Sequence, residues 1–342
     1  MEQFKLFGKK ATRYGFAEAL VELGEKNPNI VVLGADVTSS VLTSFFKEKF
    51  PERFFSIGIA EQNATTIAVG LALSGKIPFF ASYSVFSAFR NADQLRISVC
   101  YNNANVKIGG GHSGITVGPD GATHQSLEEL SLLRTLPNMT LVVPCDYIET
   151  KKATLKVAEF FGPAFVRFGR APVPWFTNED TPFEIGRAEI FREGKDVALI
   201  ACGIMVWEAL IAAEELWKRK GISAMVINNH TLKPIDVKTI VDAAKTCGAI
   251  VTAEEHQVHG GLGGAVAEVL AKNYPVPIEF VGMPDIFGVS GEPEELLVKF
   301  GFTWKEIYSS ALKAIERRDK KVITNHIYRN VKEIVPISFE IL

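Results

Sequence analysis

Short runs of apolar, mostly β-branched residues alternate with helical stretches along almost the whole chain. A helical stretch lies beside each run, for example from Arg13 to Asn27 and from Val206 to Lys220. Strands that alternate with helices favour a parallel sheet with helices on both faces, so the predicted fold class is α/β. The runs predict strands at 30–33, 54–56, 77–80, 106–108, 141–143, 164–167, 197–201, 224–228, 250–253 and 278–281.

The alternation breaks once, at 171–181, where two prolines are followed by a polar run that is typical of a linker. A chain of 342 residues is long enough for two domains of roughly 150 residues each. Each should contain its own mainly parallel sheet. We expect a first domain at 1–175, a linker at 176–186, a second domain at 187–318, and a tail at 319–342 to which the sequence assigns no role.

Composition disfavours several classes of protein. The formal charge of −2 disfavours nucleic acid or an anionic membrane surface as a partner. The longest apolar stretch, Val197 to Trp207, is too short to span a bilayer, and the N-terminus has no signal-peptide core. The four cysteines lie far apart in sequence, which disfavours disulfides or a zinc knuckle. We therefore expect a cytoplasmic protein that binds neither nucleic acid nor membrane.

Glu61 is the first candidate for chemistry. A strand is expected to end near Ile57, and a helix rich in small residues is expected to begin near Glu61. The helix dipole favours an acid in the first helical turn, and this alone is a sufficient structural reason for it. The neighbouring residues are apolar, however, so we also expect the carboxyl to be buried, which would raise its pKa.

Three aromatic residues spaced by three form the second candidate. Tyr83, Phe86 and Phe89 are expected on one face of a helix or tight turn. Such a stripe either packs into the core or offers a platform on which a flat heterocycle stacks. The polar residues from Arg90 to Arg96 favour the second interpretation.

The glycine-rich segment 109–125 is the third candidate, and it contains His112, Asp120 and His124. We expect all of it to be a loop, not a core element, that brings backbone and imidazoles close to a ligand. The separation of the two histidines does not match a metal site on a helix. Residues 254–264 also carry His256, His259 and several glycines, but further close metal ligands and the dinucleotide spacing are missing, so we expect neither site there.

In order and spacing, these motifs resemble the thiamine-diphosphate transketolase family from about Ala11 to about Arg318. His-x7-Asp-x3-His, formed here by His112, Asp120 and His124, is the most specific piece, while Gly-Ile-Ala-Glu-Gln-Asn is shared more widely among thiamine-diphosphate enzymes. The resemblance implies a pyrimidine-binding domain followed by a transketolase C-terminal domain. This is the layout of the C-terminal section of a split, two-subunit transketolase.

The resemblance also implies roles at the cofactor. Glu61 would hydrogen-bond a ring nitrogen of the aminopyrimidine of thiamine diphosphate and so promote deprotonation of the thiazolium carbon. Tyr83, Phe86 and Phe89 would surround the pyrimidine.

On the sugar side, the resemblance implies that His112 and His124 orient the carbonyl oxygen and shuttle protons, while Asp120 binds the adjacent hydroxyl. Arg13 and Arg170 would hold the substrate phosphate as a charge-assisted pair. Ser40 would lie beside that phosphate.

The Gly-Asp-Gly motif that normally binds magnesium and the diphosphate is missing, and the chain contains no Gly-Asp pair. The resemblance therefore implies half a cofactor site and no metal ligand on this chain. An N-terminal transketolase subunit would ligate the magnesium, and the expected assembly is an α2β2 heterotetramer.

The implied activity is the transfer of a two-carbon ketol unit from a ketose phosphate to an aldose phosphate, as in the pentose phosphate pathway. A 1-deoxyxylulose-5-phosphate synthase or a 2-oxoacid dehydrogenase β subunit shares the layout, although the latter normally lacks the full histidine loop. A non-catalytic regulatory or scaffolding paralogue is the alternative of another class. The intact Glu61, His112 and His124 argue against it.

Overall fold

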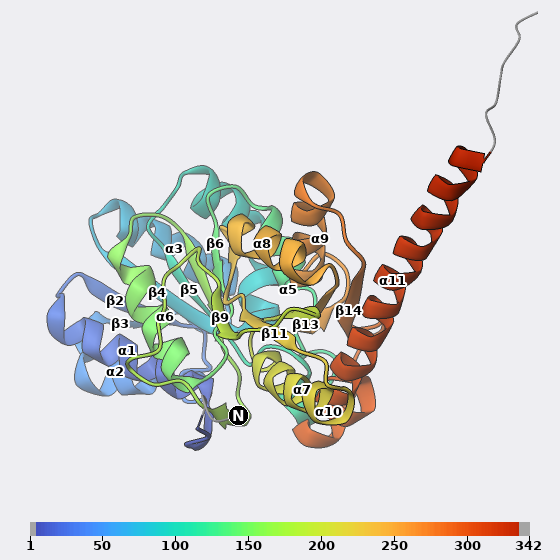
Figure 1. Ribbon diagram of the computed structural model, residues 1–342. Helices are drawn as coiled ribbons and strands as arrows, with labels where there is room; N and C mark the ends of the chain where they lie inside the picture. Colours follow the sequence, from blue (N-terminus) through green and yellow to red (C-terminus); the bar gives the residue numbers. More distant parts are fainter. Residues whose placement is uncertain (1–4, 335–342) are drawn as a thin grey trace, which may run out of the picture.

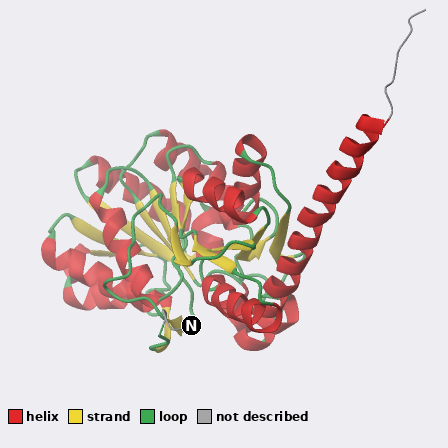
Figure 2. Ribbon diagram, in the orientation of Figure 1, coloured by secondary structure: helices red, strands yellow, loops and turns green. Residues whose placement is uncertain are grey.

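Figure 1 shows two sheets, each flanked by helices, lying side by side. The computed structural model describes residues 5–334, and in the last helix it describes side chains only as far as residue 320. The predicted α/β class is confirmed, because in both large sheets only one edge strand is antiparallel to its neighbour. Figure 2 shows helices on both faces of these sheets.

The first sheet has the order β12-β6-β7-β5-β4-β2-β3. Its strands are β2 (Ile30–Gly34), β3 (Phe54–Ser56), β4 (Ile77–Tyr83), β5 (Lys107–Gly111), β6 (Thr140–Val142), β7 (Ala164–Arg167) and β12 (Thr231–Lys233). The α-helices around it are α1 (Thr12–Lys26), α2 (Ser44–Lys49), α3 (Glu61–Leu73), α4 (Ala92–Gln94), α5 (Glu129–Thr135) and α6 (Tyr147–Glu159).

The second sheet has the order β14-β13-β10-β11-β9. Its strands are β9 (Glu189–Arg192), β10 (Val197–Ala201), β11 (Ala224–Asn228), β13 (Ile250–Gln257) and β14 (Ile278–Met283). The helices are α7 (Met205–Lys220), α8 (Val237–Cys247), α9 (Leu262–Asn273), α10 (Pro293–Phe300) and α11 (Trp304–Ile334). Helix α11 runs on through residue 318 and extends away from the body of the molecule (Figure 1), whereas residues 335–342 of the expected tail lie outside the described part. No helix within residues 5–334 combines the length and the apolar composition needed to cross a membrane.

The glycine run at the end of β5 corrects the prediction that all of 109–125 is a loop. Gly109, Gly110 and Gly111 are buried strand residues, and the loop begins only at His112. A Cβ atom at Gly110 would lie 2.1 Å from the Phe165 ring. A Cβ at Gly109 or Gly111 would likewise lie within 3 Å of a phenylalanine ring. These glycines are therefore required because phenylalanine rings occupy the space that a Cβ would need.

The proline-containing segment at 171–181 is only partly irregular. Pro172–Trp175 form β8, which pairs antiparallel with β1 (Gly8–Ala11) in a separate two-stranded sheet. A proline lacks the backbone N–H, and a two-stranded ribbon has edges where that donor is not needed. The sequence analysis missed this pairing because the partner strand lies about 160 residues earlier in the chain.

Candidate active site

The carboxyl ends of the strands in the first sheet bring most of the predicted site residues together. Tyr83 is the last residue of β4, His112 follows β5 directly, and Arg170 follows β7 by three residues. Ser40 lies in the segment between β2 and α2, and Glu61 is the first residue of α3, which follows β3. Parallel strands place such residues at one edge of the sheet, which is where ligands bind in open α/β sheets.

Glu61 is buried as expected, with 4% of its side chain exposed, but its surroundings are not purely apolar. Arg90 Nη1 lies 3.1 Å from one carboxylate oxygen of Glu61 and 3.2 Å from the other. The same guanidinium lies over the ring of Phe86, 3.8 Å from its centroid. Sequence reasoning gave Arg90 no role; the only signal was its place directly after the aromatic stripe. A hollow of about 560 Å³ opens beside this pair and is lined by Glu61, Arg90 and residues 59–63.

Two of the three predicted aromatic residues form a platform. The rings of Tyr83 and Phe86 stack with 5.9 Å between centroids and 4° between planes. Phe89 is 40% exposed, and among the described residues it has no ring contact with either of them. Phe86–Arg90 form a π-helical turn, which is wider than an α-helix and therefore carries Phe89 away from the face that a spacing of three would predict.

Both predicted histidines lie against this platform. The His112 ring stacks on Tyr83 at 4.3 Å, and the His124 ring meets Phe86 edge to face at 5.2 Å. His124 Nδ1 is also 2.9 Å from the Thr123 hydroxyl. We call residues 112–124 the histidine loop.

His112 is held as a neutral imidazole. Burial, together with the nearby charges of Arg13 and Arg170, lowers its pKa to about 3, against the opposite effect of Asp120. Its Nδ1 is buried without a hydrogen-bond partner among the described residues. The charges of Arg13, Asp120 and Arg170 all act on the pKa of this one imidazole. Three parts of the chain that are distant in sequence therefore lie close together here.

The two predicted phosphate-binding arginines already have partners. Arg170 Nη1 bonds Asp120 at 2.9 Å, and Arg13 Nη1 donates to the backbone carbonyl of Ser40 at 2.8 Å. Arg13 thus contacts the main chain of Ser40, the residue that the resemblance places beside the substrate phosphate. Arg13 Nε is buried and has no partner among the described residues.

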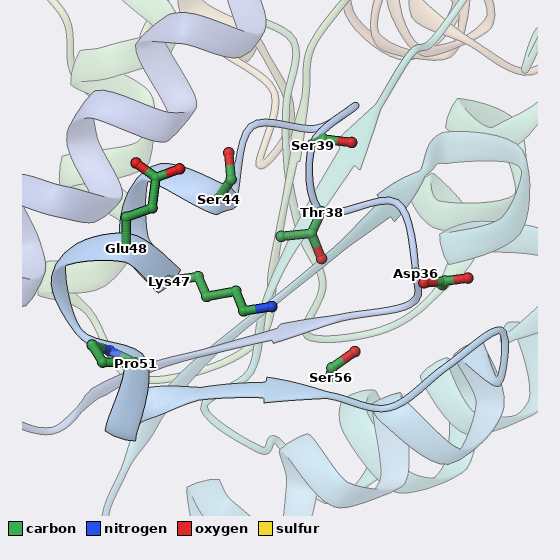
Figure 3. A pocket seen from close by; sticks show the side chains of 8 residues that line it. All are labelled: Asp36, Thr38, Ser39, Ser44, Lys47, Glu48, Pro51 and Ser56. Atoms are coloured by element: carbon green, nitrogen blue, oxygen red, sulfur yellow. The ribbon is translucent and has the colours of Figure 1, made fainter.

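A second hollow, of about 680 Å³, is lined by side chains from the segments that follow β2 and β3, among them Asp36, Thr38, Lys47 and Ser56 (Figure 3). Figure 3 shows the Lys47 side chain reaching into it between Thr38 and Ser56. The neighbouring Ser39 also lines this hollow, and Ser40 does not. The sequence analysis gave no role to any of the residues that line it.

The histidines of the second sheet are not part of a comparable site. Glu254 accepts hydrogen bonds from the backbone N–H groups of Leu262 and Gly263 at 2.7 and 2.8 Å, so it caps α9. His256 is fully buried and its Nδ1 contacts the carbonyl of Gln257 at 2.8 Å. Among the side chains that the structure describes, no group of three or more His, Cys, Asp or Glu is placed to hold a metal ion.

Family models match both halves of the chain. Residues 8–174 match the transketolase pyrimidine-binding domain, and residues 186–307 match the transketolase C-terminal domain. The chain belongs to the transketolase family. A protein of Methanocaldococcus jannaschii, provisionally named a transketolase C-terminal section, is 43% identical over 311 residues, which cover 90% of this chain and 97% of that protein.

Two further relatives are divided transketolases. A 6-deoxy-6-sulfo-D-fructose transketolase subunit of Clostridium sp. strain MSTE9 is 41% identical over 304 residues, covering 89% of this chain and 94% of that protein. Among solved structures, a split-gene transketolase described as an inactive β4 tetramer has a TM-score of 0.83 and 47% identity, covering 91% of this chain and all of that one. The chain is thus a transketolase C-terminal section, a part of a thiamine-diphosphate-dependent transferase.

The residues of this transketolase section fit the pyrimidine half of thiamine diphosphate. A buried carboxylate lies at the wall of a hollow, and the Arg90 guanidinium that it binds lies over one of two parallel aromatic rings. Both features suit a flat heterocycle with hydrogen-bonding ring nitrogens. The Arg90 guanidinium, itself flat and hydrogen-bonding, makes the same two kinds of contact, with the Glu61 carboxylate and with the Phe86 ring.

Proposed function

We propose that this chain carries the sugar site and the pyrimidine half of the cofactor site in a two-subunit transketolase that transfers a two-carbon ketol unit from a ketose phosphate to an aldose phosphate. The observation that carries the proposal is the environment of His112: a buried, neutral imidazole faces the charges of Arg13, Asp120 and Arg170 beside an aromatic platform. A sugar phosphate offers the carbonyl, hydroxyl and phosphate groups that such a set recognises.

Each residue would act through its own chemistry. Thiamine diphosphate, when bound, supplies a nucleophilic carbon that attacks the sugar carbonyl and stores the electron pair when the C–C bond breaks. Glu61 would hold a proton at a pyrimidine nitrogen, and Tyr83 with Phe86 would keep that ring in place. A neutral His112 can donate a hydrogen bond to the carbonyl oxygen of the sugar without carrying a charge. His124, whose ring lies edge-on to the same platform, would move the proton of the sugar hydroxyl.

The arginine pair would bind the anionic end of the sugar. Two guanidinium groups near His112 suit the oxygens of a phosphate. Asp120 would keep Arg170 oriented until an Asp120 carboxylate oxygen binds a sugar hydroxyl. Sugar phosphates are therefore the proposed substrates. The pentose phosphate pathway is the proposed setting and the cytoplasm the proposed location, the latter supported by four free cysteines.

A partner subunit would complete the site. The sequence lacks the magnesium motif, so we propose that an N-terminal transketolase subunit binds the diphosphate and magnesium in an α2β2 heterotetramer. We also propose the domain division at 1–175, 176–186, 187–318 and 319–342, which the ranges of the two family matches support.

The experiment is reconstitution with a candidate N-terminal subunit, followed by an assay of ketol transfer between sugar phosphates. Each subunit alone should show no measurable transfer, and calorimetry should show weak binding of thiamine diphosphate to this chain. Tight, magnesium-dependent binding by the lone chain would contradict the proposal. Formation of 1-deoxyxylulose 5-phosphate by the complex would assign the site to the synthase reaction instead.

A further inference from the structure

A buried cluster of three charged side chains lies where the two domains meet. Arg167, the last residue of β7, bonds the Glu129 carboxylate through Nε at 2.6 Å. Its Nη1 lies 3.7 Å from a carboxylate oxygen of Glu255 on β13. No more than 5% of any of the three side chains is exposed. Burying charges is costly even when they are paired, so the cluster calls for a role beyond packing.

The cluster contacts the chain near both ends of the histidine loop. Past the C-terminal end of the loop, Arg167 Nη2 donates to the carbonyl of Ser126 at 3.3 Å. Near the N-terminal end, the Glu255 carboxylate accepts a hydrogen bond from the backbone N–H of Thr116 at 2.8 Å. The N–H of Gly114 donates to the same Ser126 carbonyl at 2.8 Å, so the two ends are joined to each other as well.

The loop needs such support because its backbone is strained. His112 has a φ of +54°, which non-glycine residues rarely adopt, and such conformations persist only when the surroundings enforce them. Gly114 has a φ of +78°, and a Cβ there would lie 2.2 Å from the carboxyl carbon of Glu255. The second domain thus supplies the surface on which the strained part of the loop rests.

We propose that Glu129, Arg167 and Glu255, which we call the loop clamp, position His112 and His124 by holding the histidine loop at both ends. The effect of this clamp on sugar chemistry rests on the proposed function. The three side chains are positioning residues that act through the loop. In consequence the second domain, which carries none of the predicted site residues, controls the reaction through Glu255.

The first test measures the loop directly, by amide hydrogen exchange in the full chain. Glu255→Ala removes the acceptor of the Thr116 N–H, while Arg167 keeps Glu129 as its partner. We expect exchange at Thr116 and along 112–126 to become about tenfold faster or more, because a buried donor loses its acceptor. Glu255→Gln keeps an acceptor oxygen, so its exchange rates should lie between those of the unaltered chain and those of Glu255→Ala. Glu268→Ala is the control, since it breaks another ion pair between the domains, with Arg134 at 2.7 Å, that does not touch the loop.

The second test measures catalysis in the complex with the N-terminal subunit. Glu255→Ala should lower kcat about tenfold or more, and equally for glycolaldehyde and for a phosphorylated acceptor, because the clamp acts on the histidines and not on the phosphate. Glu255→Gln should restore most of the activity, and Glu268→Ala should leave it unchanged. This pattern separates positioning from a general loss of stability.

Two results would overturn the proposal: loop exchange in Glu255→Ala no faster than in Glu268→Ala, or faster exchange with an unchanged kcat. A complex of unaltered subunits that transfers no ketol unit would overturn the proposed function instead. The exchange measurement would then still decide whether the clamp holds the loop.

Discussion

The carboxyl ends of the strands in the two sheets carry similar residue types and use them differently. In the first sheet, His112 follows β5, and its buried Nδ1 has no hydrogen-bond partner among the described residues. In the second sheet, Asn228 ends β11 and donates to Glu149 of the first domain at 2.6 Å, while Glu255 accepts from Thr116. The polar residues of the second edge therefore bind the neighbouring domain.

This difference teaches that a histidine or acid at the end of a parallel strand does not by itself make a site. Both edges have the geometry in which α/β proteins bind ligands. Side chains of the first domain cover polar residues of the second edge, however, whereas hollows open beside Glu61 and beside Lys47 at the first sheet. The covered edge still matters for chemistry, because it supports the loop that the open edge presents.

Glu61→Gln gives the largest expected effect and is best compared with Glu254→Gln. Both acids are buried beside the start of a helix that follows a strand. Gln at 61 keeps the shape but cannot exchange the proton, so proton exchange at the thiazolium carbon in the reconstituted complex should slow about 100-fold or more. Glu254→Gln should lower the melting temperature and leave that exchange unchanged. Near-normal proton exchange in Glu61→Gln would show that the assignment is wrong.

Arg13→Ala and Arg170→Ala should each raise the Michaelis constant for phosphorylated sugars about 10- to 100-fold, since a charge-assisted contact contributes roughly 1.5–3 kcal/mol. Turnover should change less, and glycolaldehyde, which has no phosphate, should react almost normally. Arg187→Ala is a suitable control because Arg187 pairs with Glu184 on the surface. Equal losses on both kinds of acceptor would mean that the two arginines support the fold and bind no phosphate.

His112 and His230 are both buried and have similarly lowered pKa values, but the causes differ, and NMR titration can separate them. Burial alone lowers the pKa of His230 to about 3, whereas Arg13 and Arg170 add to the effect of burial at His112. Arg13→Gln should therefore raise the pKa of His112 and leave that of His230 unchanged. An unchanged His112 pKa in this variant would contradict the placement of Arg13.

The same shifts predict how stability depends on pH. Unfolded histidines take up protons near pH 6.5, whereas these two stay neutral in the folded chain down to about pH 3. The contribution of the two neutral histidines to the free energy of unfolding should be complete above about pH 6.5. Below that pH the free energy of unfolding should fall by about 1.4 kcal/mol per pH unit for each histidine. In His230→Gln, denaturant titrations should show that the free energy of unfolding falls less steeply with decreasing pH, because one proton fewer is taken up on unfolding.

The smallest expected effect is at the second edge. His259 is exposed, and no metal-holding group was found around it in the described part of the chain. His259→Ala should leave kcat/KM within about a factor of two of the unaltered complex, measured beside His124→Ala, which should lose about 100-fold. A large loss in His259→Ala would remove the distinction between the two edges.

Much of the fold could be predicted from the sequence, because buried parallel strands are continuous apolar runs. The strands at 164–167, 197–201 and 224–228 lie where their residues predict. The pairing of β1 with β8 and the buried run Gly109–Gly111 could not be predicted. Both depend on partners far away in the sequence, and a glycine run is typical of a loop unless rings such as those of Phe16 and Phe165 pack against it.

The structure brings most of the predicted site residues together, whereas the partners of these residues could not be predicted. The spacing of His112, Asp120 and His124 carries a family signal, and the strand ends that hold the site follow from the fold. The pairing of Arg90 with Glu61 depends on a π-helical turn, which no local pattern indicates. Arg167 has no distinguishing sequence pattern of its own, and only the approach of the second domain makes it the centre of a buried cluster.

Strand β12 has a consequence for how this polypeptide can be divided. Thr231–Lys233 come from the second domain in sequence, yet they pair with β6 at the edge of the first sheet. A cut at 176–186 would leave the first half with an open sheet edge, which is a site for aggregation. The two domains should therefore melt in a single cooperative transition, and neither should be separable from the other as a stable unit.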